Sequence, residues 1–331
     1  MEIQNGVELC FPQFLNSSCR KPTLNWSKRV LLNTVLSFIS LMTAVLNLLV
    51  IISVSHFRQL HTPSNIILLS LAVSDFLVGL LLMPVEIYRN STCWVLGDSM
   101  CSLYSYLNCN IVTASIGNIV LISVDRYVAI CDPLRYPTRI TAVRTKLSVC
   151  LCWLYAVFYS SFYTKDVLIE PGRYNSCDGE CVFVVSEIAG IVDLVLFFIV
   201  PVTVIIVLYM RVFVVAVSQA RAMRSHVTAV TLQRSLNQTN RSELKAARTL
   251  GVLVVVFLAS YCPFYCYSLV NENVVNDPSA SFVVMIFYFN SCLNPLIYSL
   301  FYPWFRNAVK LIITLRIFKC ESSETNIHQS Q

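Results

Sequence analysis

A single carboxylate interrupts a long apolar stretch of the chain. Residues 188–209 read IAGIVDLVLFFIVPVTVIIVLY, and Asp193 is their only charged residue. A carboxylate at membrane depth is costly, usually faces the interior of a helix bundle, and marks a candidate functional site. The stretch holds no lysine or arginine that could neutralise it. A cationic ligand would supply the missing charge.

The elements that position this carboxylate must cross a membrane. The 331 residues are 56% hydrophobic and only 13% charged, with a mean hydropathy of +0.66, which excludes an ordinary soluble domain. Stretches long enough to cross the hydrocarbon core as helices occur at 30–54, 64–87, 101–124, 147–164, 187–212, 249–271 and 280–302. We therefore predict an all-α membrane protein, a seven-transmembrane helix bundle.

Three regions follow from this pattern. Residues 1–28 are polar, and we expect no cleavable signal peptide among them. Residues 29–302 form the bundle, and residues 303–331 form an amphipathic helix and a tail. Such a helix lies on the cytoplasmic surface of a membrane. Cys320 follows it as a candidate for palmitoylation, which the sequence does not decide.

The basic residues predict the orientation of the bundle. With the N-terminus outside, 17 of the 24 lysines and arginines fall on the cytoplasmic side, as the positive-inside rule requires. Glycosylation sequons at Asn16, Asn25 and Asn90 fall outside under the same topology. We expect a multi-pass protein of the plasma membrane, in contact with lipid, with an extracellular N-terminus. Six of the 14 cysteines also fall outside, where disulfides persist: Cys10, Cys19, Cys93, Cys101, Cys177 and Cys181.

Several motifs stand in a fixed order along the spans. They are Asn47, LAVSD ending at Asp75, DRY at Asp125-Arg126-Tyr127, Trp153, Pro201 with Tyr209, Pro263, and NPLIY from Asn294 to Tyr298. With this ordered set, the chain resembles the rhodopsin-like G protein-coupled receptors along essentially its whole length. Within that family, FNSCLNPLIYSLFYPWF at 289–305, HFRQLHTPSN and DPLRYPTRIT are similar to segments of trace amine-associated receptors. The resemblance implies a receptor for amines, olfactory and fish-like, that activates a stimulatory heterotrimeric G protein and raises cyclic AMP.

The amine site departs from the pattern that the resemblance implies. Amine receptors commonly hold the ligand ammonium with an aspartate seven residues after the cysteine that opens the third span. Here that position is Asn108, which carries no charge. Asp193 lies at a similar depth, about 10 Å below the outer end of the fifth span, and some fish members of the family carry an aspartate there. The alternative is that Asp193 is protonated or paired with internal polar groups.

The resemblance also implies the walls of the ligand cavity. These are Tyr104, Val112, Phe264, Tyr265 and Tyr288, whose aromatic members could hold an ammonium by cation–π attraction or could serve only in helix packing. Glu86 near the outer rim could bind the far end of a diamine, or could be a solvated helix end. The family's disulfide implies Cys101–Cys181. Cys177 then pairs with Cys19 or with Cys10, Cys19 being favoured, and Cys93 stays free.

A second acid, Asp75, matches the family's sodium pocket. The positions that complete it are Ser115, Asn290, Ser291 and Asn294, whose oxygens suit a hard cation. The alternative is a hydrated polar network without sodium.

The resemblance assigns further residues to activation. Ile116, Pro201 and Phe257 match a packing triad, and Tyr261 stands where a tryptophan is usual, which puts the basal activity in doubt. Arg126 would pair with Asp125 and Glu243 in the inactive state. When freed, it would meet the G protein with support from Tyr209 and Tyr298. Tyr127 completes the DRY motif, and Pro295 belongs to the NPLIY motif.

Other classes of function remain as alternatives. A receptor of the same fold for a neutral or peptide ligand is the main one, because Asn108 removes the usual anchor. A membrane transporter is a remote alternative, since the sequence shows no internal repeat. We expect no enzyme, because HExxH, GxSxG and metal-spaced clusters are missing from the sequence. We also expect no resident cofactor and no nucleic-acid partner.

Overall fold

The computed structural model describes residues 9–14, 17–20, 26–225, 233–270 and 278–314. Within these residues, seven helices are long and apolar enough to cross a membrane, as the sequence predicted. Their spanning parts are Arg29–His56, Pro63–Ser91, Asp98–Cys131, Ala142–Tyr163, Glu187–Val215, Gly251–Leu269 and Phe282–Leu300. The fold is thus the expected all-α bundle.

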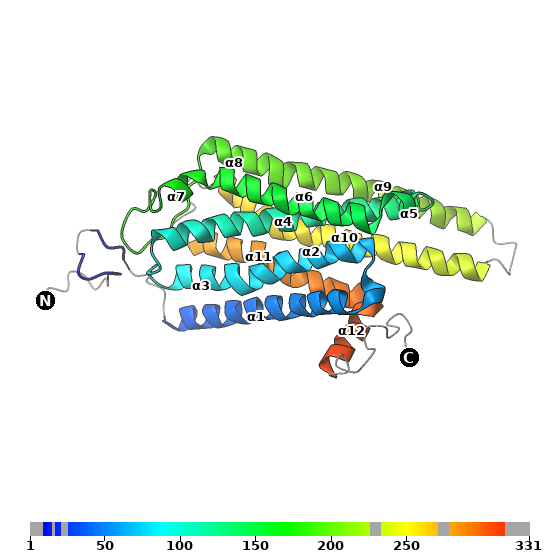
Figure 1. Ribbon diagram of the computed structural model, residues 1–331, viewed down its shortest axis with the longest axis horizontal. Coiled ribbons are helices and arrows are strands. Elements are labelled where there is room, and N and C mark those ends of the chain that lie inside the picture. Colours follow the sequence, from blue (N-terminus) through cyan, green and yellow to red (C-terminus); the bar gives the residue numbers. More distant parts are fainter. Residues whose placement is uncertain (1–8, 15–16, 21–25, 226–232, 271–277, 315–331) are drawn as a thin grey trace.

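The long helices run side by side, with the N-terminus at one end of the bundle and the C-terminus at the other (Figure 1). Their bounds are α1 Trp26–His56, α2 Pro63–Leu77, α3 Met83–Ser91, α4 Asp98–Cys131, α6 Ala142–Tyr163, α8 Glu187–Asp193, α9 Val200–Ser225, α10 Gln233–Val270 and α11 Pro278–Phe301. Short helices lie at the ends of the bundle: η1 Arg58–Leu60, α5 Tyr136–Arg139, α7 Lys165–Ile169 and α12 Pro303–Ile313. The helix α12 confirms the amphipathic segment expected after the seventh span.

Two spans contain a wide, π-helical turn just before a proline. Val78–Leu82 joins α2 to α3 ahead of Pro84, and Leu194–Ile199 joins α8 to α9 ahead of Pro201. Proline has no backbone N–H and its ring clashes with the carbonyl four residues earlier, so the helix widens there. Such turns are frequent at functional sites. The second begins directly after Asp193.

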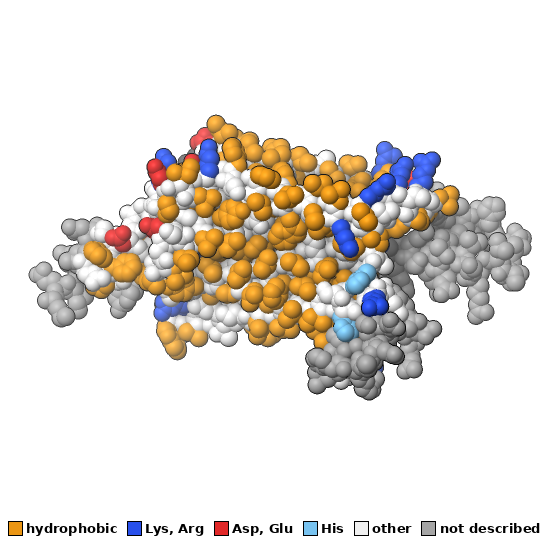
Figure 2. Space-filling view, in the orientation of Figure 1, with side chains coloured by type: hydrophobic (Ala, Val, Ile, Leu, Met, Phe, Trp, Pro, Cys, Tyr) orange, Lys and Arg blue, Asp and Glu red, His pale blue; other side chains and the backbone are white. Residues whose placement is uncertain are grey.

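The core is apolar and the outer surface is too. Leu71, Ile116, Phe257 and Tyr298 are almost fully buried between helices. Many other apolar side chains face outward along the sides of the bundle, in the broad apolar belt of Figure 2. On the face shown, acidic side chains gather at the N-terminal end and most lysines and arginines at the opposite end. An apolar belt between charged ends is what a lipid bilayer requires.

Candidate functional site

The Asp193 carboxylate lies between two tyrosine hydroxyls near the N-terminal end of the bundle. Tyr159 of α6 donates to Oδ1 at 3.1 Å, and Tyr265 of α10 donates to Oδ2 at 3.4 Å. The side chain is partly buried. Among the described residues, no lysine, arginine or histidine forms an ion pair with it. Asp193 is therefore held by neutral donors.

Aromatic rings surround this carboxylate. Tyr265 stacks on Phe198 with ring centroids 4.6 Å apart and meets Phe264 edge to face at 5.3 Å. Tyr159 packs against Phe197 at 4.2 Å and stacks on Tyr163 at 5.4 Å. Rings around a carboxylate give a place where an ammonium gains both an ion pair and cation–π contacts.

Sequence reasoning named Tyr265 but missed Tyr159 and Tyr163. A signal was present, because Tyr155, Tyr159 and Tyr163 recur at every fourth position. That spacing places three tyrosines on one face of a helix. In the structure this face is turned toward the fifth span, since Tyr155 and Tyr159 both contact Phe197.

Asn108 belongs to a neighbouring polar cluster on the third span. Tyr288 of α11 donates to Asn108 Oδ1 at 2.8 Å, and its hydroxyl lies 3.5 Å from that of Tyr104. Tyr104 in turn donates to Glu86 Oε2 at 2.6 Å. The amide at the usual anchor position is thus bound by protein groups. Val112, one turn along α4, is partly buried against the core.

Glu86 is not a solvated helix end, and that alternative is wrong. Only 2% of its side chain is exposed, and Arg89 binds it through Nη2 at 2.7 Å and Nε at 3.2 Å. The Asn90 amide nitrogen also donates to Oε1 at 3.0 Å. An N-linked glycan would be bonded to that same nitrogen, which would then keep a single N–H for this contact. Asn16 and Asn25 lie outside the described residues.

A row of rings connects the two polar clusters. Tyr288 meets Phe287 at 5.9 Å, Phe287 meets Phe264 at 5.0 Å, and Phe264 meets Tyr265. All of the predicted cavity residues except Val112 therefore belong to one connected set of contacts between Glu86 and Asp193. The set draws on α3, α4, α6, α8, α10 and α11.

Among the described residues, three disulfides fasten the N-terminal end of the bundle. Cys101 is bonded to Cys181 and Cys19 to Cys177, the pairs that the resemblance implied and favoured. Cys93 is bonded to Cys10, so the expectation that Cys93 stays free is wrong. The partner was not predicted because the resemblance implied no bond between these two cysteines, which only the fold brings together.

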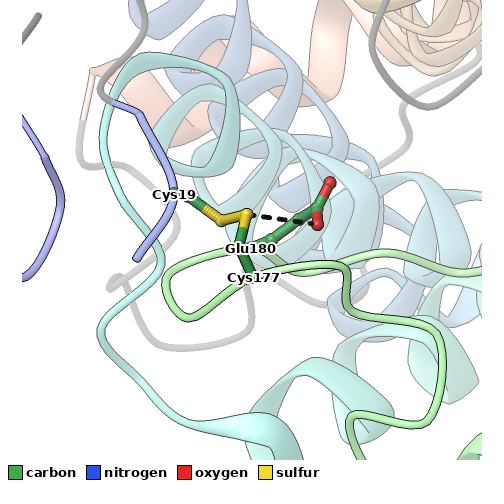
Figure 3. Close-up of side chains that lie close together, drawn as sticks. All are labelled: Cys19, Cys177 and Glu180. Carbon is green, nitrogen blue, oxygen red and sulfur yellow. Dashed lines mark hydrogen bonds between the residues drawn. A yellow bond between two sulfur atoms is a disulfide. The ribbon is translucent and has the colours of Figure 1, made fainter. Parts of the chain in front are cut away.

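The N-terminal segment is also held by backbone hydrogen bonds to the loop after α7. Asp178 donates its N–H to the Ser17 carbonyl at 2.7 Å, and Cys19 donates to the Asp178 carbonyl at 2.9 Å. Figure 3 shows Glu180 beside the Cys19–Cys177 bond, with Oε2 at 3.8 Å from Cys177 Sγ. These groups are close enough to suggest a metal site. The disulfide uses up both thiolates, so they cannot serve as metal ligands.

Asp75 is fully buried and lies among the partners that the sequence predicted. Ser291 Oγ and Asn294 Nδ2 each donate to it at 2.7 Å, and Ser115 Oγ donates at 3.4 Å. Asn290 is buried nearby on α11, and its Nδ2 has no hydrogen-bond partner. Among the described residues, Asp75 has no cationic partner.

Tyr261 lies between the aromatic row and Asp75. It stacks on Phe257 at 4.3 Å and packs against Phe287 at 4.4 Å. The Ser115 side chain lies close to its hydroxyl, and a buried tyrosine hydroxyl needs such a polar neighbour. Ile116, Pro201 and Phe257 are all buried in this region.

At the opposite end of the bundle, Arg126 is held by Asp125 and Ser64. The guanidinium pairs with Asp125, whose carboxylate also accepts hydrogen bonds from Ser64 and Tyr136, each at 2.8 Å. Burial raises the pKa of Tyr136, so its hydroxyl keeps the proton that it donates. Tyr127 and Tyr209 each pack against a separate small cluster of Ile130 and Val212. Tyr298 is fully buried, and its hydroxyl has no hydrogen-bond partner among the residues that the structure describes.

Two predicted residues of this region are not described. The Glu243 side chain in α10 lies outside the described part of the chain, so its pairing with Arg126 remains a prediction. Cys320 lies outside it as well.

Comparison with known proteins gives a consistent answer over the whole chain. Residues 46–298 match the family model of the 7 transmembrane receptor (rhodopsin family). The chain is 38% identical to trace amine-associated receptor 13c of Danio rerio, over 97% of this chain and 96% of that one. It is 39% identical to trace amine-associated receptor 8b of Mus musculus, over 98% and 97%, and 36% identical to receptor 9 of Rattus norvegicus, over 98% and 99%. The chain therefore belongs to the trace amine-associated receptors of the rhodopsin family.

Proposed function

We propose that this receptor detects amines and that Asp193, in the fifth span, binds the ligand ammonium. The observation that carries the proposal is the Asp193 carboxylate, which has two tyrosine donors and no cationic partner among the described residues. The related proteins are trace amine-associated receptors by name. Asn108 in the third span has no charge to offer.

The geometry suits a primary or substituted ammonium. Each carboxylate oxygen accepts one hydrogen bond from a tyrosine, and a carboxylate has about four acceptor positions in all, so room for a charged donor remains. An ammonium bound to this carboxylate would also lie close to the rings of Tyr265 and Tyr159, whose hydroxyls contact it. The bound ammonium would then sit toward the fifth and sixth spans.

Signalling would follow the rest of the family. We propose coupling to a heterotrimeric G protein of the stimulatory type, a raised level of cyclic AMP, and an olfactory role at the plasma membrane with the N-terminus outside. Asp125 and Arg126 would hold the inactive state. Ile116, Pro201, Phe257 and Tyr261 would repack when a ligand binds.

A sodium ion would fit the Asp75 cluster. The donors there are a buried carboxylate without a cationic partner and the hydroxyls of Ser115 and Ser291, which are hard oxygen ligands. Asn290 and Asn294 complete the set. When bound, the ion would neutralise the carboxylate charge.

The test is a cyclic AMP reporter assay over a panel of amines, with wild type compared with Asp193→Asn. We expect the substitution to weaken amine responses at least about a hundredfold, because a buried charge pair loses one partner. Glu187→Gln is the matched control, since Glu187 is an exposed acid on the same helix, α8. Amine responses that survive Asp193→Asn unchanged would favour the alternative, in which Asp193 only binds the tyrosines and the ligand is neutral or a peptide.

A further inference from the structure

We propose that the Glu86–Arg89 ion pair restricts this receptor to ligands with one ammonium group and an uncharged far end. The inference rests on the proposed function, since it concerns the other end of a ligand anchored at Asp193. Two acids, Glu86 and Asp193, lie at the two ends of the connected set of contacts, and an amine with two ammonium groups would be expected to use both. The environments of the two acids differ sharply.

Glu86 is saturated with donors from its own chain. Its two oxygens accept four hydrogen bonds of 2.6 to 3.2 Å, from Arg89 Nε, Arg89 Nη2, Asn90 Nδ2 and Tyr104 Oη. Four donors fill about four acceptor positions. A ligand ammonium would have to displace one of these donors, and no water would compensate for the loss because only 2% of Glu86 is exposed.

Arg89 is fixed in place and carries its own positive charge. Besides Glu86, it binds the Cys181 carbonyl, to which its Nη1 donates at 3.1 Å. Cys181 is in turn bonded to Cys101 at the start of α4. The guanidinium is therefore attached to α3 and to the disulfide-bonded loop, and it cannot turn away without breaking a buried contact. A second ammonium at this end would meet a cation in place of a free carboxylate.

The other described side chains of this connected set, at the Glu86 end, are neutral. Tyr104, Tyr288 and Asn108 offer hydroxyl and amide groups, and Phe287 and Phe264 continue the wall with rings. An apolar tail, or a tail with a hydroxyl group, fits these surroundings. An unpaired ammonium would be desolvated among them without an anion.

The experiment compares pentylamine with the matching diamine, which has a second ammonium in place of the terminal methyl group. In wild type we expect the diamine to be at least about tenfold less potent, a difference of about 1.4 kcal/mol. Equal or greater potency of the diamine would overturn the proposal. This comparison requires no variant, so it cannot fail through misfolding.

Two variants test the role of the pair itself. Arg89→Met frees the Glu86 carboxylate, and we expect the diamine-to-monoamine potency ratio to rise at least about tenfold. The double variant Glu86→Gln with Arg89→Met removes both charges and should show no such rise. A ratio that stays at its wild-type value in Arg89→Met, or that rises equally in the double variant, would overturn the proposal.

Asp193→Asn in the same assay separates this inference from the proposed function. Loss of both responses in Asp193→Asn, together with equal potency of the two ligands in wild type, would leave the anchor intact and reject only the selectivity. Survival of the monoamine response in Asp193→Asn would reject the anchor itself.

Discussion

Removing the charge of Asp125 should switch the receptor on without a ligand. Asp125 and Arg126 form an ion pair in which 3% of the aspartate side chain and 20% of the arginine side chain are exposed. Exposed pairs contribute about 0–1 kcal/mol, whereas breaking a fully buried pair costs about 3–5 kcal/mol. For this nearly buried pair we expect the inactive state to lose about 2 kcal/mol of stabilisation, which changes the equilibrium constant between the inactive and active states about thirtyfold.

That factor predicts a large rise in basal activity. If about 1% of the wild-type receptor is active without ligand, within the usual range for a minor state, Asp125→Asn should raise the active fraction to about 20%. The assay is ligand-free cyclic AMP accumulation at matched surface expression, with sensors for the other G protein classes run in parallel.

Asp132→Asn, at the same end of the bundle, is the control for Asp125→Asn. Asp132→Asn makes the same chemical change, but Asp132 is 35% exposed and meets an exposed Arg139 at 3.5 Å. It should leave basal signalling within about twofold of wild type. The reasoning is refuted if Asp125→Asn leaves basal activity unchanged, or if Asp132→Asn raises it equally.

Three further variants have expected outcomes. Tyr261→Phe removes the hydroxyl that contacts Ser115; we expect basal cyclic AMP to rise about fivefold, from a loss of about 1 kcal/mol, and an unchanged basal level would contradict the link. Asn108→Asp adds a carboxylate beside the Tyr288 hydroxyl and should extend the response to further amines in a dose–response panel; an unchanged panel at normal surface expression would count against a shared cavity. Serine at both Cys10 and Cys93 should lower the thermal inactivation midpoint of the purified receptor while the amine response persists, because Cys19 still holds the N-terminal segment; total loss of the response would show that this disulfide shapes the site.

The spans were predictable because their signal is compositional. Each needs about 20 apolar residues whatever its neighbours do, so all seven were found in the sequence. The wide turns before Pro84 and Pro201 were harder to predict from the sequence. Proline predicts a disturbed helix but does not say whether the helix kinks, breaks or widens.

The side-chain partners show where sequence reasoning ends. Asp75 has the partners expected of it because they lie in motifs with fixed spacing. Glu86 was misjudged, since its burial depends on Arg89 and on a tyrosine 18 residues away. An acid three residues before an arginine on a helix can be exposed or buried, and only the neighbouring spans decide which.

The central claim is that the Asp193 charge binds the ligand charge, and one measurement tests it most directly. It compares the potency of an amine with that of the alcohol of the same skeleton, in wild type and in Asp193→Asn. We predict that wild type prefers the amine and that Asp193→Asn lowers this preference about a hundredfold, or about 2.7 kcal/mol. An amine preference that is the same in both receptors, at equal surface expression, would contradict the claim.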